Sequence, residues 1–127
     1  DLPNEIKLIS QYMHGNTKMG GIWRGGRRYV DVDYDAGFIL ATKKLDRFRF
    51  TARFDWFGTT DNSFEKYDNN NEDGTSFTAA ITADVFKKDM ILLEYLHIDS
   101  ERPARETIGF ASEQKNDIIQ LSYRKRF

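Results

Sequence analysis

DIIQLSYRKRF, from Asp117 to Phe127, alternates apolar and polar side chains along its length. In an extended chain, successive side chains point to opposite faces. The residues that share the apolar face are Ile119, Leu121, Tyr123 and Phe127. Because helical spacing would scatter them around the axis, the stretch predicts a β-strand with one apolar face, which needs further strands as partners.

Five earlier segments show the same alternation and predict five more strands. They are Ile6–Met13, Val30–Leu40, Phe48–Trp56, Ser76–Phe86 and Met90–Ile98. The chain has 127 residues, which is the size of a single domain. We therefore expect an all-β fold over residues 1–127, in which about six antiparallel strands follow one another up and down.

The second and third predicted strands have the sharpest contrast between their two faces. A turn with Leu45 at its apex makes apolar residues meet across the strands. The pairs predicted on this face are Leu40 with Phe50, Phe38 with Ala52, Ala36 with Phe54, and Tyr34 with Trp56. On the other face the same register pairs Gly37 with Arg53 and Asp35 with Asp55. Asp31, Asp33 and Asp35 would thus face Arg47, Arg49 and Arg53.

The predicted connections alternate in length, as they do in transmembrane β-barrels. Long ones cover residues 14–28, 58–75 and 100–116, and short ones lie near Leu45 and Lys88. No run of about 18 apolar residues predicts a transmembrane helix, and the mean hydropathy of −0.65 is compatible with barrel strands. The net charge of −1, with dispersed Lys and Arg, argues against nucleic acid as a partner. There is no cysteine for a disulfide or a thiolate metal site.

Several segments resemble the C-terminal portion of porin-like outer-membrane proteins of Gram-negative bacteria, a largely uncharacterised family. They are FDWF at 54–57, Asp61-Asn62, NEDG at 71–74, LEYLHIDSERPAR at 93–105 and QLSYRKRF at 120–127. The resemblance covers residues 47–127 well and residues 1–46 only through the strand pattern. It implies the bacterial outer membrane, the lipid bilayer and lipopolysaccharide as surroundings, and recognition of the last strand by the barrel-assembly machinery.

Six strands are fewer than the eight or so of the smallest membrane barrels. We therefore expect the chain to form the last six strands of a larger transmembrane β-barrel. A barrel shared by several copies of the chain is the second choice. The expected function is passive diffusion of small hydrophilic or charged solutes, with no enzymatic activity and no cofactor or metal.

The strand pattern also predicts which side chains line such a channel. The expected pore-lining residues are Asp31, Asp33, Asp35, Arg47, Arg49, Arg53, Asp55, Glu94 and Arg124. Rows of opposed fixed charges would create a field that selects among small ions. Tyr34 and Trp56 are expected in the outer aromatic girdle of the membrane, and Tyr123 and Phe127 in the periplasmic one.

The alternative is a soluble β-barrel or clam that turns its apolar faces inward and binds a small hydrophobic ligand. The fifth predicted strand favours this alternative, since both of its faces are apolar except at Glu94. The row of aspartates could also bind a cation, although residues two apart on a strand are about 6 to 7 Å apart. A calcium loop at 69–80 is excluded, because Ala80 occupies the position of its bidentate acid.

Overall fold

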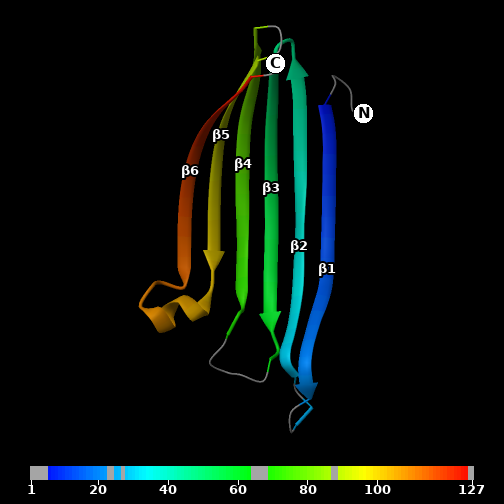
Figure 1. Ribbon diagram of the computed structural model, residues 1–127, viewed down its shortest axis with the longest axis vertical. Coiled ribbons are helices and arrows are strands. Elements are labelled where there is room, and N and C mark those ends of the chain that lie inside the picture. Colours follow the sequence, from blue (N-terminus) through cyan, green and yellow to red (C-terminus); the bar gives the residue numbers. More distant parts are fainter. Residues whose placement is uncertain (1–5, 23–24, 27, 64–68, 87–88, 126–127) are drawn as a thin grey trace.

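The computed structural model describes residues 6–22, 25–26, 28–63, 69–86 and 89–125. Six strands form one antiparallel sheet in chain order, so the predicted all-β, up-and-down arrangement is confirmed (Figure 1). The strands are β1 (Ile6–Ile22), β2 (Arg28–Leu45), β3 (Phe48–Asp61), β4 (Glu72–Val85), β5 (Asp89–Glu101) and β6 (Glu113–Arg124). The sheet is open, and β1 and β6 are its edges. A 3-10 helix, η1 (Pro103–Ile108), precedes β6.

The two short turns lie at one end of the sheet, and the long connections lie at the other with η1 (Figure 1). The β2–β3 turn contains only Asp46 and Arg47, because Leu45 pairs directly with Phe48. Asp46 has a φ of 52°, a left-handed conformation that two-residue hairpins require and that Asp tolerates. The predicted apex at Leu45 is therefore wrong.

The register between β2 and β3 differs from the predicted one by three residues. Leu40 pairs with Arg53 instead of Phe50, Gly37 with Trp56 instead of Arg53, and Asp35 with Gly58 instead of Asp55. Likewise Phe38 pairs with Asp55, Ala36 with Phe57 and Tyr34 with Thr59. Because side chains alternate with period two, a shift by an odd number exchanges the faces. The aspartate row of β2 therefore lies on the opposite face from Arg49 and Arg53.

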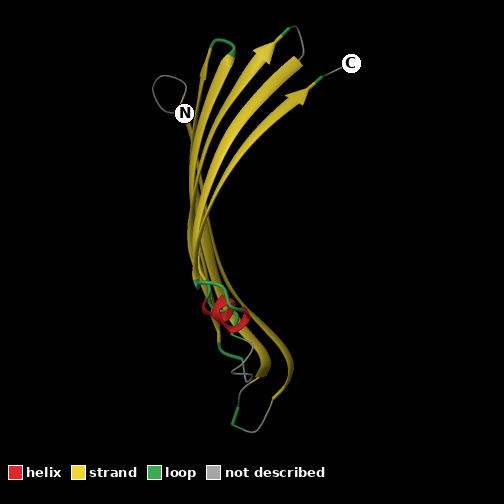
Figure 2. Ribbon diagram, turned by 90° about the vertical axis from the view of Figure 1, so that its left-hand side faces the viewer, coloured by secondary structure: helices red, strands yellow, loops and turns green. Residues whose placement is uncertain are grey.

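The sheet bows along its length and fans out at the short-turn end (Figure 2). On its apolar face the side chains of Phe50, Phe54, Phe77, Ile81, Leu93 and Tyr95 are 38% to 47% exposed. Their neighbours on the other face, such as Thr51, Arg53 and Thr78, are half-buried. Side chains on the inside of a curved sheet crowd together, so this difference indicates that the apolar face is the outer one. No described hydrophobic side chain is fully buried.

Aromatic side chains cover glycines on neighbouring strands, and two of these contacts lie beyond the predicted ends of the strands. The pairs are Tyr34 over Gly15, Trp56 over Gly37 and Phe57 over Gly74, each a direct cross-strand pair. A Cβ atom at any of these glycines would overlap the ring. β1 consequently continues through Gly15, where a loop was predicted, to Ile22. Its register shifts between Met19 and Ile22, where Gly20 has a φ of 79°.

The connection between β5 and β6 is fastened to the sheet by Arg105 of η1. Its guanidinium donates hydrogen bonds to the carbonyl oxygens of Ser100 (3.0 Å) and Ser112 (2.8 Å), and to Oε1 of Glu72 (3.0 Å). Ser100 also accepts a bond at its hydroxyl (2.8 Å) and is one of the few buried residues. This predicted long loop is thus a shorter, ordered segment that contacts β4.

Candidate functional site on the two faces of the sheet

The outer face carries an apolar belt that crosses all six strands and is interrupted by Ser10 of β1 and Lys43 of β2. The belt consists of Ile6, Leu8, Tyr12, Ile39, Ala41, Leu45, Phe48, Phe50, Ala52, Phe54, Trp56, Phe77, Ala79, Ile81, Ala83, Val85, Ile91, Leu93, Tyr95, Ile119, Leu121 and Tyr123, which the register places on one face. On β3 it runs from Phe48 to Trp56, about 26 Å at about 3.3 Å per residue. The predicted apolar faces of β1, β3, β4 and β5 are confirmed, as is that of β6 for Ile119, Leu121 and Tyr123, whereas β2 contributes Ile39 and Ala41 instead of Phe38 and Leu40.

A charged band borders the belt on the side of the long connections. It contains His14, Lys18, Asp31, Asp33, Asp35, Asp73, His97, Asp99, Glu101, Glu113, Lys115 and Asp117, all on the same face as the belt. Some of these charges are paired, with Lys18 Nζ 3.7 Å from Asp31 and Lys115 Nζ 3.1 Å from Asp99. The change from apolar to charged residues does not occur at one level, because the register places the first charged residue of β5, His97, beside Phe77 of the belt, and β3 contributes no charged residue to the band.

The aromatic residues predicted for the membrane interfaces do not all lie on this face. Trp56 belongs to the belt, and Gly37 lies between it and Tyr12 of β1 at the edge of the charged band. Tyr34 lies on the opposite face, so the predicted pairing of Tyr34 with Trp56 is wrong. Tyr123 lies at the short-turn end of the belt, where its hydroxyl donates to Asp89 (2.5 Å). Phe127 lies outside the described residues.

The inner face, which we call the mixed face, holds a fixed ion pair near its middle. Arg53 donates from Nε to Oδ1 of Asp55 (2.8 Å), and its guanidinium carbon lies 4.1 Å from the centre of the Phe38 ring. Ser76 donates to the other carboxylate oxygen of Asp55 (3.2 Å). The Phe38 ring of β2 and the Ser76 hydroxyl of β4 thus hold the Arg53–Asp55 pair of β3 in its orientation. The predicted opposition of Asp35 and Asp55 does not occur.

The remaining predicted pore-lining residues divide between the two faces. Arg49, Glu94 and Arg124 lie on the mixed face with Arg53 and Asp55. Lys44, which the prediction omitted, pairs directly with Arg49 and places two cations side by side. Arg47 lies in the short turn, with its guanidinium 5.0 Å from the Phe48 ring.

The three aspartates of β2 lie in the charged band, where Asn16 donates to both Asp31 (2.9 Å) and Asp33 (2.6 Å). Their predicted position against the arginines is therefore wrong. Over the described ranges, no group of three or more metal-ligating side chains is arranged to hold a metal ion.

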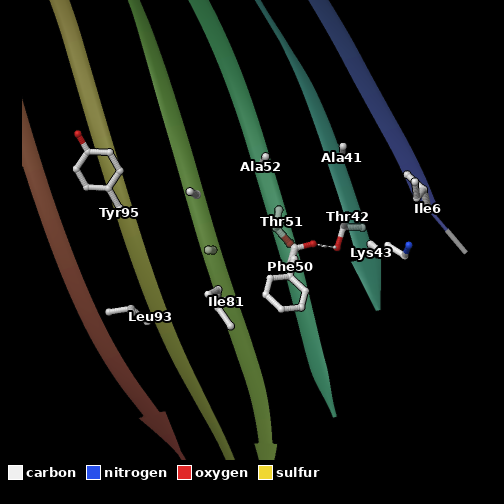
Figure 3. A pocket seen from close by; sticks show the side chains of 12 residues that line it. Ile6, Ala41, Thr42, Lys43, Phe50, Thr51, Ala52, Ile81, Leu93 and Tyr95 are labelled. Carbon is white, nitrogen blue, oxygen red and sulfur yellow. Dashed lines mark hydrogen bonds between the residues drawn. The ribbon is translucent and has the colours of Figure 1, made fainter. Parts of the chain in front are cut away.

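The belt contains a shallow hollow of about 530 Å³ in its middle (Figure 3). Its floor is formed by Ala41, Ala52 and Ala79, which the register aligns across β2, β3 and β4. Larger side chains surround the floor: Ile6, Lys43, Phe50, Ile81, Leu93 and Tyr95. In the sequence, Ala52 and Ala79 lie on predicted apolar faces, but Ala41 lies just beyond the predicted end of its strand, and the alignment of the three depends on the register that was predicted incorrectly for β2.

Beyond the belt, Asp61 organises the start of the β3–β4 connection. Its carboxylate accepts hydrogen bonds from the backbone N–H of Ser63 (2.8 Å) and from both the backbone N–H (3.1 Å) and Nδ2 (3.0 Å) of Asn70. Partial burial would raise the pKa of Asp61, but the bonds from Ser63 and Asn70 outweigh it and lower the pKa below its usual value.

The lowered pKa of Asp61 predicts that acid loosens this connection. An aspartate whose pKa is lower in the folded than in the unfolded state stabilises the fold fully above its unfolded pKa of about 4. That stabilisation is lost as the pH falls through the lower folded value. Amide exchange at Ser63 and Asn70 should therefore be slow, relative to the intrinsic rate, at pH 6 and faster at pH 3. Asp61→Asn should remove this pH dependence, and a variant that still exchanges faster at pH 3 than at pH 6, relative to the intrinsic rate, would contradict the prediction.

Comparison with protein-family models, with curated proteins and with solved structures finds no match to this chain. Among the described residues there is no helix that is both long and apolar enough to span a membrane.

Proposed function

We propose that the sheet is part of the wall of an outer-membrane, porin-like β-barrel that acts as a passive channel for small hydrophilic or charged solutes. The observation that carries the proposal is the exposed apolar belt on the outer face, bounded by a charged band and backed by the mixed face. Membrane barrels have an apolar outer band about 25 Å tall and a polar interior. The belt is about 26 Å long on β3, and its vertical height is smaller if the strands are tilted.

The two open edges of the sheet support the proposal that it is part of a larger barrel. Within the described residues, β1 and β6 each leave one side of the backbone without a partner strand, and unpaired backbone groups are not tolerated in a bilayer. Further strands of the same protein would satisfy these groups, and β6 would be the strand that the barrel-assembly machinery recognises. The short turns would then face the periplasm and the long connections the cell exterior, at the level of lipopolysaccharide.

Spin labels on neighbouring residues of β4 test the orientation of the two faces. The chain has no cysteine, so Ile81→Cys and Ala80→Cys each provide one labelling site. In phospholipid vesicles, the label at position 81 should be accessible to oxygen, which dissolves in lipid. The label at position 80 should be accessible to a water-soluble nickel complex. If both labels respond alike, or if the protein stays soluble and monodisperse without detergent, the membrane proposal is wrong.

Ion selectivity in planar bilayers tests the channel. The short-turn half of the mixed face carries Lys7, Lys44, Arg49 and Arg124 against Asp84 and Glu94, so we expect a preference for anions. Lys44→Gln should move the reversal potential in a salt gradient toward the value expected for a cation-selective channel. Lys43→Gln, one residue away on the outer face, should leave it unchanged. A correctly inserted protein that gives no conductance steps would contradict the channel.

The hollow on the apolar face favours a second candidate, a soluble β-barrel or clam that binds a small hydrophobic ligand. Its volume is within the range of about 300–1,000 Å³ of small-molecule pockets. The mixed face is also apolar on β5, where Leu92, Leu96 and Ile98 are half-buried. In such a protein the apolar face would be turned inward, which the comparison of labels at positions 80 and 81 would detect.

A further inference from the structure

The hollow on the outer face has a distinct shape. Ala41, Ala52 and Ala79 are direct cross-strand neighbours, so three methyl groups form a low floor across β2, β3 and β4. Phe50 and Ile81 stand on the short-turn side of this floor (Figure 3). Phe54 and Phe77, themselves a cross-strand pair, stand on the other side. A flat protein surface would rest on these rings without filling the hollow, whereas a flexible hydrocarbon chain can enter it.

Lys43 provides a positive charge at the rim of the hollow. It lies between Ile6 and Phe50 in the register and lines the hollow with them (Figure 3). Its ammonium group has no ion pair or hydrogen bond within the described part of the chain. The long stem of a lysine lets its charge reach the headgroup level while the stem stays in apolar surroundings. An occupant that combines a hydrocarbon chain with an anionic head therefore matches both features.

We infer that the hollow is a binding site for an acyl chain of an anionic phospholipid, whose headgroup meets Lys43. The inference rests on the proposed function, since it requires the apolar face to contact a bilayer. The lipid belongs to the leaflet nearest the short turns, because Lys43 lies toward that end of β2. Lys43 sets the headgroup preference, and the alanine floor holds the chain.

Lipid retention by the full-length protein, measured by native mass spectrometry from detergent micelles, tests the inference. The probes are phosphatidylglycerol and phosphatidylcholine with identical acyl chains. We expect about a fivefold preference for phosphatidylglycerol, the factor that one interfacial lysine contributes. Lys43→Gln should abolish the preference, and Lys44→Gln on the mixed face should retain it. Equal retention of both lipids by the unaltered protein, or equal effects of the two variants, would overturn the inference.

Filling the floor gives an independent test. Ala52→Leu should reduce retention of both lipids several-fold, while Thr78→Leu on the mixed face should not; unchanged retention in Ala52→Leu would overturn the proposed site. Conductance of the same samples separates this inference from the proposed function. Insertion and ion-selective conductance without a lipid preference would overturn only the lipid site, whereas failure of the protein to enter vesicles would overturn both.

Discussion

Replacing Ile81 by arginine should destabilise the folded protein in phospholipid vesicles by about 2 to 4 kcal/mol, which is the cost of a charge near the bilayer midplane on a membrane barrel. Ile81 lies in the middle of the apolar belt, between Phe50 and Leu93, and its side chain is 41% exposed. In the proposed barrel a new guanidinium there would meet lipid, and no carboxylate lies directly across from it on either neighbouring strand. Denaturant titration of the protein in vesicles measures the change.

The neighbouring residue supplies a matched control. Ala80 lies on the mixed face, directly opposite Glu94 and Thr51. Ala80→Arg should therefore change the folding free energy by no more than about 0.5 kcal/mol, as surface substitutions usually do. Equal losses in the two variants would show that the outer and inner faces have been assigned incorrectly.

Period-two alternation was enough to predict the strands. Of the five strands other than β2, four have one apolar face and one face that is polar or nearly so. The order and direction of the strands followed from the alternation of long and short connections, which is typical of up-and-down barrels. The phase of β2 could not be obtained in this way. Phe38, Ile39, Leu40 and Ala41 form a continuous apolar run, so the alternation fits either face there.

The turn residue held the missing information about β2. Asp46 is a residue that tolerates positive φ, and a two-residue turn at Asp46 and Arg47 would have given the observed register. Placing Leu45 at the apex moved the pairing by three residues and exchanged the faces. The prediction therefore placed Trp56 on the apolar face of β3 and Arg53 and Asp55 together on its other face, as observed, but it placed the aspartate row on the wrong face.

Glycines misled the prediction of strand ends for a related reason. Gly15 and Gly74 were predicted to lie in connections between strands, but each lies within a strand, beneath an aromatic ring of the neighbouring strand. Such contacts are long-range and depend on register, so local sequence does not reveal them. At each of these positions the absence of a Cβ atom leaves room for the ring of the cross-strand partner.

Gly37→Ala should be among the most damaging small substitutions in the chain. A Cβ atom at Gly37 would overlap Cζ2 of Trp56, so the indole must move and give up its stacking on Phe54, where the ring centres are 6.3 Å apart. Forcing a methyl group into a packed contact typically costs about 1 to 3 kcal/mol. Gly21→Ala is the control, because nothing lies within 4 Å of a Cβ at that position.

A double-mutant cycle identifies the indole as the cause. Trp56→Ala removes the ring that a Cβ at Gly37 would meet, so Gly37→Ala should be nearly neutral in that background. The coupling energy between the two sites should then be about 1 to 3 kcal/mol, within the range for residues in direct contact. Denaturant titrations of the four proteins in vesicles provide the cycle. Additive effects would mean that Gly37 is needed for its backbone conformation and not for its contact with the Trp56 ring. The contact between the indole and the glycine would then not stabilise the pairing of β2 with β3.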